Sequence, residues 1–217
     1  MRHARSLASS KRQSDRVRPE SFRLGVVSDA GKGAPPEFIP FAGSEIAGAA
    51  KHIPGYAPAD PLRVGFESFY KIARELPPLF ERHWRELALD RERVPLDVDW
   101  DRYLALAATD ALHVVTVRDG DVLVGYIFNI VGPHLHYRST IHAELEMFWL
   151  DPAYRGAENG WFALRMFREN EKHLRSLGVK KVHVAEKLHF MGGRVGLIFK
   201  RLGYKPVETN WGKWIGG

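Results

Sequence analysis

Two acidic side chains stand inside one apolar run, near the start of the segment AELEMFWLDPAYRGAENGWFALRMF. Residues 141–150 of this run predict a β-strand, in which side chains two positions apart share a face. Glu144 and Glu146 are therefore expected on one face. The opposite face is expected to carry Leu145, Met147 and Trp149. Two carboxylates held close together raise the pKa of one of them, which suits it to accept a proton near neutral pH. Solvent-facing acids paired with neighbouring Arg or Lys side chains are the alternative.

Other residues with chemical potential form weaker patterns. His134, His136 and His142 lie close together, but no carboxylate pattern accompanies them, so no metal site is expected. The Gly-Lys-Gly at 31–33 lacks the Ser or Thr and the spacing of a phosphate-binding loop and predicts a turn. No Gly-x-Ser-x-Gly elbow and no Gly-rich dinucleotide loop occurs, which leaves hydrolase and oxidoreductase functions without support.

The composition indicates one folded domain with an N-terminal extension. The chain has 217 residues, 45% of them hydrophobic, and no cysteine, which agrees with a reducing compartment and a cytoplasmic location. No apolar run is long enough to span a membrane, so no membrane partner is expected. Most of the net charge of +6 lies in residues 1–23, which hold seven basic and two acidic residues. Residues 1–22 are interpreted as a basic disordered arm with a possible weak contact to nucleic acid, and residues 23–61 as an irregular lead-in.

The remaining chain, residues 62–217, predicts alternating strands and helices. The Asp119-Gly120 pair between two β-branched runs is a strong hairpin signal within residues 111–131. A polar loop is expected after this hairpin, at residues 132–140. The other expected elements are a strand at 62–66, helices at 67–87 broken by Pro77 and Pro78, a helix at 99–108, the strand at 141–150, a helix at 159–177, a strand at 179–186, a helix at 192–203 and a terminal strand or hairpin at 204–215. This order predicts a mixed α/β sheet with a crossover to a parallel neighbour.

At this point the sequence resembles the GNAT superfamily of acetyl-CoA-dependent N-acyltransferases. The resemblance covers about Leu62 to Trp214 and is most specific in WLDPAYRGAENG and in IFKRLGYKPVE. The terminal VETNWGKWI and the KLH at 187–189 are also similar to GNAT-like proteins of tailed bacteriophages. The resemblance implies a GNAT-like, mostly antiparallel mixed sheet with flanking helices, in which one parallel strand pair splays apart and admits the pantetheine arm of acetyl-CoA.

The same resemblance implies a set of cofactor-binding residues. The free backbone of Phe148, Trp149 and Leu150 would bond the pantetheine arm. The following loop and helix start would offer backbone N–H groups and a helix dipole to the pyrophosphate. These loop residues are Arg155, Gly156, Ala157, Asn159 and Gly160. Glu158 departs from the family pattern, which has glycine there, and its side chain would crowd and repel the phosphates.

The resemblance also implies catalytic roles. In many members a glutamate on this strand, eleven residues before the Arg or Gln of the loop, is the general base, and this position is Glu144. Glu146 is then a supporting charge or a ligand for the ammonium group of the acceptor. The tyrosine that often protonates the departing thiolate is replaced by Phe199, and a frequent asparagine by Gly192. His189 is a candidate substitute acid, with a surface histidine as the alternative.

Three functions stay open on these residues. The first is transfer of an acetyl or acyl group from acetyl-CoA to a primary amine, with Glu144 as general base. The second is a catalytically degraded GNAT-fold module that binds a protein or nucleic-acid partner, which Glu158, Phe199 and Gly192 favour. The third is an acyl-CoA sensor without turnover. A homodimer is possible with each of them.

Overall fold

The computed structural model describes residues 62–155, 160–190 and 194–216. The basic arm 1–22 and the lead-in 23–61, both expected from sequence, lie outside the described residues. So do the loop residues 156–159 and Gly192.

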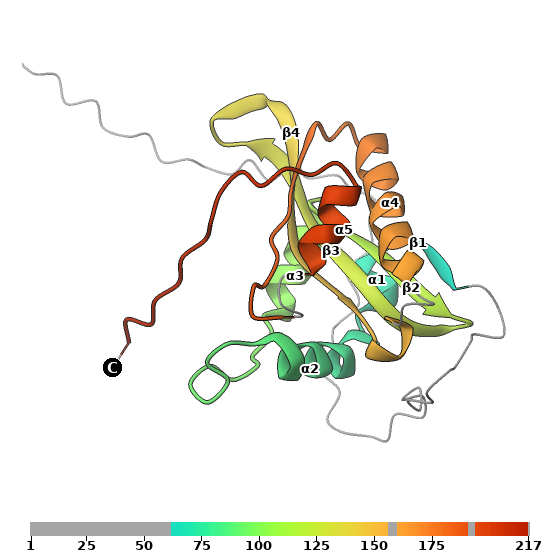
Figure 1. Cartoon of the computed structure of the whole chain (residues 1–217). Helices are drawn as coiled ribbons and strands as arrows, with labels where there is room; N and C mark the ends of the chain where they lie inside the picture. The colour runs from blue at the N-terminus through green and yellow to red at the C-terminus, as the bar shows by residue number, and fades with distance from the viewer. Residues whose placement is uncertain (1–61, 156–159, 191–193, 217) are drawn as a thin grey trace, which may run out of the picture. The chain divides into compact units, whose positions relative to one another are not determined.

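A five-stranded sheet forms the centre of the described chain, in the order β1-β2-β3-β4-β5 (Figure 1). Strands β1 to β4 pair antiparallel, and β5 pairs parallel to β4. The strands are β1 (Arg63–Glu67), β2 (Leu112–Asp119), β3 (Val122–His134), β4 (Tyr137–Leu150) and β5 (Lys181–His183). The expected mixed, mostly antiparallel α/β sheet with one parallel pair is confirmed.

Helices cover both faces of this sheet, α4 and α5 on one side and α1 to α3 on the other (Figure 1). They are α1 (Phe69–Ile72), α2 (Leu76–Leu87), α3 (Trp100–Ala108), the short 3-10 helix η1 (Pro152–Tyr154), α4 (Gly160–Ser176) and α5 (Val195–Arg201). Pro77 and Pro78, expected to break a helix, stand in the first turn of α2, where a missing N–H costs no intrahelical hydrogen bond. Each helical layer therefore has its own buried interface with the sheet.

The hairpin between β2 and β3 is confirmed, with its turn one residue later than the Asp-Gly signal suggests. Asp119 pairs with Val122, so Gly120 and Asp121 form the two-residue turn. Gly120 has a φ of 58°, a conformation that a side chain would strain. Glycine at the first turn position is what tight hairpins of this length favour.

The prediction of a polar loop at 132–140 is wrong, because β3 and β4 continue through these residues as a long hairpin. Strand β3 runs to His134 and β4 starts at Tyr137, and these two residues pair. The side chains of this extension are mostly exposed on both faces. Polar side chains do not prevent backbone pairing where both faces of a ribbon meet solvent, so hydrophobic alternation could not mark this part of the strands.

The prediction of a C-terminal strand or hairpin at 204–215 is also wrong. Residues 204–216 have no strand or helix, and Trp211 and Ile215 are 92% and 90% exposed. The preceding strand is shorter than expected, with β5 limited to Lys181–His183. An aromatic and β-branched composition favours a strand only when a neighbour supplies hydrogen bonds, and the short β5 offers few.

No helix within the described part of the chain is both long and apolar enough to cross a membrane.

Candidate active site

The parallel pairing of β4 with β5 ends halfway along β4. The paired positions are His142 with Lys181, Ala143 with Val182, and Glu144 with His183. From Leu145 onward β4 pairs with β3 only, among the described residues. This stretch includes Phe148 to Leu150, where the family resemblance implies that the backbone of β4 is free.

A β-bulge in β4 decides which side chains face which layer. Phe128 of β3 pairs with Met147, and Asn129 pairs with Leu145, so Glu146 is the additional residue on β4. A bulge shifts the alternation of side chains by one position. The expectation that Met147 and Trp149 oppose the acids is therefore wrong.

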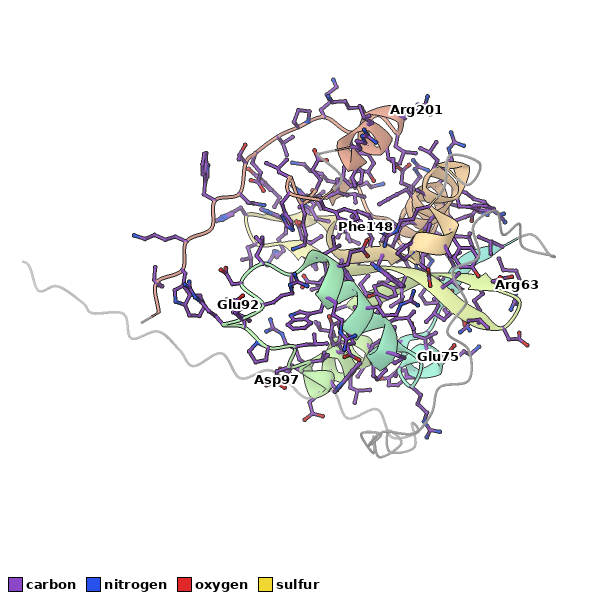
Figure 2. All side chains as sticks on the ribbon, turned by 60° about the horizontal axis from the view of Figure 1, so that its bottom comes forward. Arg63, Glu75, Glu92, Asp97, Phe148 and Arg201 are labelled. Atoms are coloured by element: carbon purple, nitrogen blue, oxygen red, sulfur yellow. The ribbon has the colours of Figure 1, made fainter. Side chains whose placement is uncertain are left out.

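Packing on the two faces of β4 agrees with this shift. Leu145 and Phe148 both pack into the core under α4 and α5. Glu146 and Met147 both line a cavity on the α2 and α3 side, and Trp149 stacks against His83 of α2. Figure 2 shows Phe148 in the middle layer, between α2 and α5.

That cavity has a volume of about 520 Å³ and lies between α2, α3 and the sheet. Much of its wall is apolar, with aromatic rings from Phe80, Trp84 and Tyr103. Its polar side chains are His83, Asp97, Asp99, Arg102, Glu146 and Lys187. Because Glu146 belongs to β4 and Lys187 follows β5, the cavity extends to the place where the two strands separate. Its size is that of a small-molecule site.

His83 connects the cavity wall to the buried side chains of the sheet. Its Nδ1 lies 2.8 Å from the hydroxyl of Tyr126, which is fully buried. A buried phenol needs an acceptor for its proton, so Tyr126 donates to Nδ1, and the ring proton of His83 is on Nε2. Burial lowers the pKa of His83 to about 4, with smaller contributions from Lys187 and Arg155. The imidazole is therefore neutral at physiological pH.

Arg155, expected to bind the cofactor, anchors the end of β4 to α2. Its guanidinium forms a bidentate ion pair with Glu86, with 2.8 Å between Nη2 and Oε2. Its Nε donates to the carbonyl of Leu150 at 2.5 Å, and Glu86 also accepts from the indole of Trp149 at 2.8 Å. Burial alone would raise the pKa of Glu86, but the hydrogen bonds from Arg155 and Trp149 hold it below its usual value. This network ties Arg155, which follows η1, to the end of β4 and to α2.

The predicted catalytic residues lie close to this site but not inside the cavity lining. Glu144 is exposed on β4, and its carboxylate lies 3.9 Å from Nε2 of His183. Its cross-strand neighbour Ile130 lines the cavity. His189 lies within 3.3 Å of the carbonyl of Leu87, at the end of α2. Glu144 therefore lies at the edge of the cavity, and Glu146 is the acid of β4 that lines it, together with Asp97 and Asp99.

Of the remaining residues predicted to bind the cofactor, Phe199 lies in the core and Gly160 begins α4. The others are outside the described residues. Phe199 is buried and packs edge-on against Phe148 and Phe167, so its ring supports β4 from the α5 side. Gly160 is the first residue of α4. Gly156, Ala157 and Asn159, together with Glu158, are outside the described residues.

Three histidine rings lie close together between the long hairpin and β5. His134 and His142 have ring centroids 4.6 Å apart, and His142 and His183 are 5.6 Å apart. Within the described ranges, no group of three or more acidic or histidine side chains has an arrangement that could hold a metal ion. The ring of His136 lies at the edge of this group, tilted relative to that of His134 with 5.7 Å between the centroids.

Sequence reasoning missed His83 and Glu86, two polar residues of α2 that reach the site. They are three positions apart, so they share one face of the helix. The helical spacing of this segment could have indicated that face, but not which strand it would contact. The partners, Tyr126 and Arg155, lie more than 40 residues away in the chain.

The sequence of this domain matches the model of the acetyltransferase (GNAT) family over residues 68–190, more than half of the chain. The chain belongs to this family. Comparison with curated protein sequences gave no significant match.

Solved structures show the same fold at low sequence identity. A ribosomal-protein-alanine N-acetyltransferase from Brucella melitensis biovar Abortus 2308 is 13% identical, with a TM-score of 0.56 over 73% of this chain and 100% of that one. An aminoglycoside acetyltransferase from an uncultured soil metagenomic sample is 10% identical, with a TM-score of 0.57 over 72% and 100%. A predicted acetyltransferase from Clostridium acetobutylicum, solved with acetyl-CoA, is 15% identical, with a TM-score of 0.50 over 71% and 96%. None of these three is described as a bacteriophage protein, so that narrower resemblance has no support from them.

Proposed function

We propose that the chain transfers an acetyl group from acetyl-CoA to a primary amine bound in the cavity between α2, α3 and the sheet. The observation that carries this proposal is the position of the cavity. Its lining includes Glu146 and Met147 on β4 and Lys187 after β5, on both sides of the point where the strands separate. An acceptor in the cavity would meet a thioester held between the strands at that point.

Acetyl-CoA would be held by β4 and by the start of α4. The backbone of Phe148 and Trp149, with Leu150 fixed by Arg155, is the proposed pantetheine contact. The first turn of α4, a helix of 17 residues, has backbone N–H groups without intrahelical acceptors and the positive end of the helix dipole, which suit a pyrophosphate. Gly156, Ala157, Asn159 and Gly160 are the proposed loop contacts, and Phe199 supports Phe148 from behind.

The proposed reaction needs a neutral amine, because an alkylammonium group with a pKa of about 10.4 has no lone pair at neutral pH. Glu144 takes the proton, directly or through water, and the amine nitrogen attacks the thioester carbonyl carbon. The carbon–sulfur bond breaks, and the electron pair leaves with the thiolate of coenzyme A. Free thiols have a pKa of about 8.5, so this leaving group needs little help, and His189 is the proposed proton donor. Glu146 holds the ammonium group before deprotonation.

Calorimetric titration with acetyl-CoA tests the cofactor part of this proposal. The wild-type protein is expected to bind with a micromolar Kd, and a variant lacking residues 1–22 is expected to bind equally well. The Glu158→Gly variant reports whether the departure from the glycine pattern matters. Absence of binding by the wild type, with binding restored in Glu158→Gly, would favour the alternative function, a GNAT-fold module that binds a protein or nucleic-acid partner.

A further inference from the structure

We propose that the acceptor is a monocationic primary amine carried on an apolar body of aromatic size. This inference rests on the proposed function and concerns the substrate class of the same site. It sets apart arylalkylamines from amines that carry phosphate groups, many hydroxyls or several positive charges.

The shape and polarity of the cavity favour an apolar body. Phe80 is buried and stacks on Trp100 at 5.6 Å, and Tyr103 stacks on Phe69 at 5.6 Å, so both rings are held in place. Trp84 adds a third aromatic side chain, and Leu106 and Met147 contribute aliphatic surface. A sugar placed against this apolar part of the wall would lose the water around its hydroxyls and find no hydrogen-bonding groups there, which is unfavourable.

The charges of the lining favour one positive charge. Asp97, Asp99 and Glu146 are opposed by Arg102 and Lys187, and His83 is neutral because burial lowers its pKa to about 4. The lining therefore has one more negative than positive charge. A single ammonium group balances it, whereas a phosphorylated amine adds negative charge and a polyamine brings more cations than the site can pair.

Glu146 is the carboxylate that is best placed for the ammonium group. Asp99 accepts a hydrogen bond from the backbone N–H of Arg102 at 2.9 Å and caps α3. Glu146 forms no ion pair with any residue in the described part of the chain. Burial, and after it the negative charge of Glu146, raise the pKa of Tyr103 to about 12. Its position on the bulge of β4 places it beside the separation of β4 and β5. An amine bound to Glu146 would thus lie next to the proposed thioester position.

The experiment compares 2-phenylethylamine with glucosamine 6-phosphate and with an aminoglycoside, on the full chain. Direct binding of each amine is measured by calorimetry, and transfer is measured from acetyl-CoA by release of the thiol. Because the chain has no cysteine, a thiol reagent reports only coenzyme A. The expected result is that 2-phenylethylamine binds at least tenfold more tightly than either other amine and has the highest kcat/KM.

Two acid-to-amide variants locate the ammonium group. Glu146→Gln is expected to raise the Kd for 2-phenylethylamine about tenfold, the effect of a pairing free energy of about 1.4 kcal/mol. Glu92→Gln is the matched control, because Glu92 lies on the exposed segment after α2 and is not part of the cavity lining (Figure 2). An equal Kd for Glu146→Gln and the wild type would contradict the assignment.

The outcomes separate this inference from the proposed function. Tighter binding or faster transfer with glucosamine 6-phosphate or the aminoglycoside would overturn the substrate class and leave acetyl transfer intact. Binding of 2-phenylethylamine that depends on Glu146, without any transfer, would support the class and contradict the proposed function. No binding of 2-phenylethylamine would overturn the inference.

Discussion

At the scale of single residues, burial and pairing decide which groups of the site carry charge. His83 and Glu86 stand three positions apart on α2, and one side chain is neutral whereas the other is charged. Burial keeps His83 neutral beside Tyr126, whereas Arg155 and Trp149 keep Glu86 ionised. One face of a short helix thus supplies a neutral wall to the cavity and a charged anchor to the end of β4.

His83 makes stability depend on pH in a defined window. The pKa of His83 is about 4 in the folded protein and 6.5 in an unfolded chain, so the unfolded state binds more protons between these values. The free energy of unfolding should therefore fall as the pH drops from about 6.5 to about 4, by at most about 3 kcal/mol. Urea unfolding of His83→Gln across this range should show a flatter profile than the wild type. A wild-type profile in the variant would show that His83 is not held neutral.

The ion pair of Arg155 with Glu86 should contribute more than an exposed pair on the same helix. Arg155→Gln leaves the carboxylate of Glu86 partly buried without its partner, at a cost of about 1–3 kcal/mol. Arg85→Gln is the control, because Arg85 pairs with Glu81 on the surface, where such pairs contribute about 0.5 kcal/mol. Urea midpoints of the two variants give the comparison, and equal losses would refute the anchoring role of Arg155.

The stabilisation by the ion pair of Glu86 with Arg155 should be lost at low pH, when Glu86 takes up a proton. Its pKa lies below the usual 4.5, so the stabilisation is complete above that pH and is lost as the pH falls through the lower folded value. Glu86→Gln should remove this loss, which lies below about pH 4.5 and is therefore separate from most of the window of His83. Thermal unfolding of Glu86→Gln at pH 3.5 and pH 7 is the measurement. A Tm that drops as much in the variant as in the wild type would contradict it.

At the scale of elements, the bulge in β4 is the feature that organises the site. It lets Leu145 and Phe148 face one layer while Glu146, Met147 and Trp149 face the other. Strand periodicity predicted β4 and the shared face of its two acids. The extra residue at Glu146 could not be predicted, because a bulge depends on the register of the neighbouring strand.

Sequence predicted elements well where hydrophobic periodicity and turn residues agree. The hairpin with Gly120, the helix α4 and the helix ending before Gly203 follow from such signals. It failed at 132–140 and 204–215, where pairing with a neighbour, or its lack, outweighs composition.

Gly125 on β3 should be intolerant of a side chain because β4 passes close to it. A Cβ there would lie 3.0 Å from the carbonyl oxygen of Trp149 and 3.3 Å from the Cα of Leu150. Gly125→Ala should therefore destabilise the fold by about 1–3 kcal/mol. It should also weaken acetyl-CoA binding, because the displaced backbone belongs to the proposed pantetheine contact.

Gly132 provides the matched control on the same strand. A Cβ at Gly132 meets no atom within 4 Å, so Gly132→Ala should change the free energy of unfolding by no more than about 0.5 kcal/mol. Chemical denaturation and acetyl-CoA titration of both variants test the pair. Similar stability and affinity in the two variants would contradict the close approach of β3 and β4.

At the scale of the whole domain, the two faces of the sheet differ in what packs against them. The face under α4 and α5 packs an apolar core around Phe148, Phe167 and Phe199, and the face under α2 and α3 carries both a buried aromatic cluster and the cavity. The family resemblance predicted the fold and its parallel strand pair, and the cofactor role of the β4 end stays a proposal. It could not predict the cavity walls, because they come from α2, α3 and the segment between them, from two strands and from Lys187, which are brought together only by folding.

The most direct test of acetyl transfer with Glu144 as general base is a steady-state assay. It measures release of coenzyme A from acetyl-CoA in the presence of 2-phenylethylamine, for the wild type and for Glu144→Gln. An acetyltransferase with Glu144 as general base should form N-acetylphenylethylamine, and the variant should lose about 10²-fold or more in kcat while it binds acetyl-CoA unchanged. Equal kcat in the two proteins would contradict the role of Glu144. Absence of acetylated product from the wild type with every amine tested would contradict acetyl transfer itself.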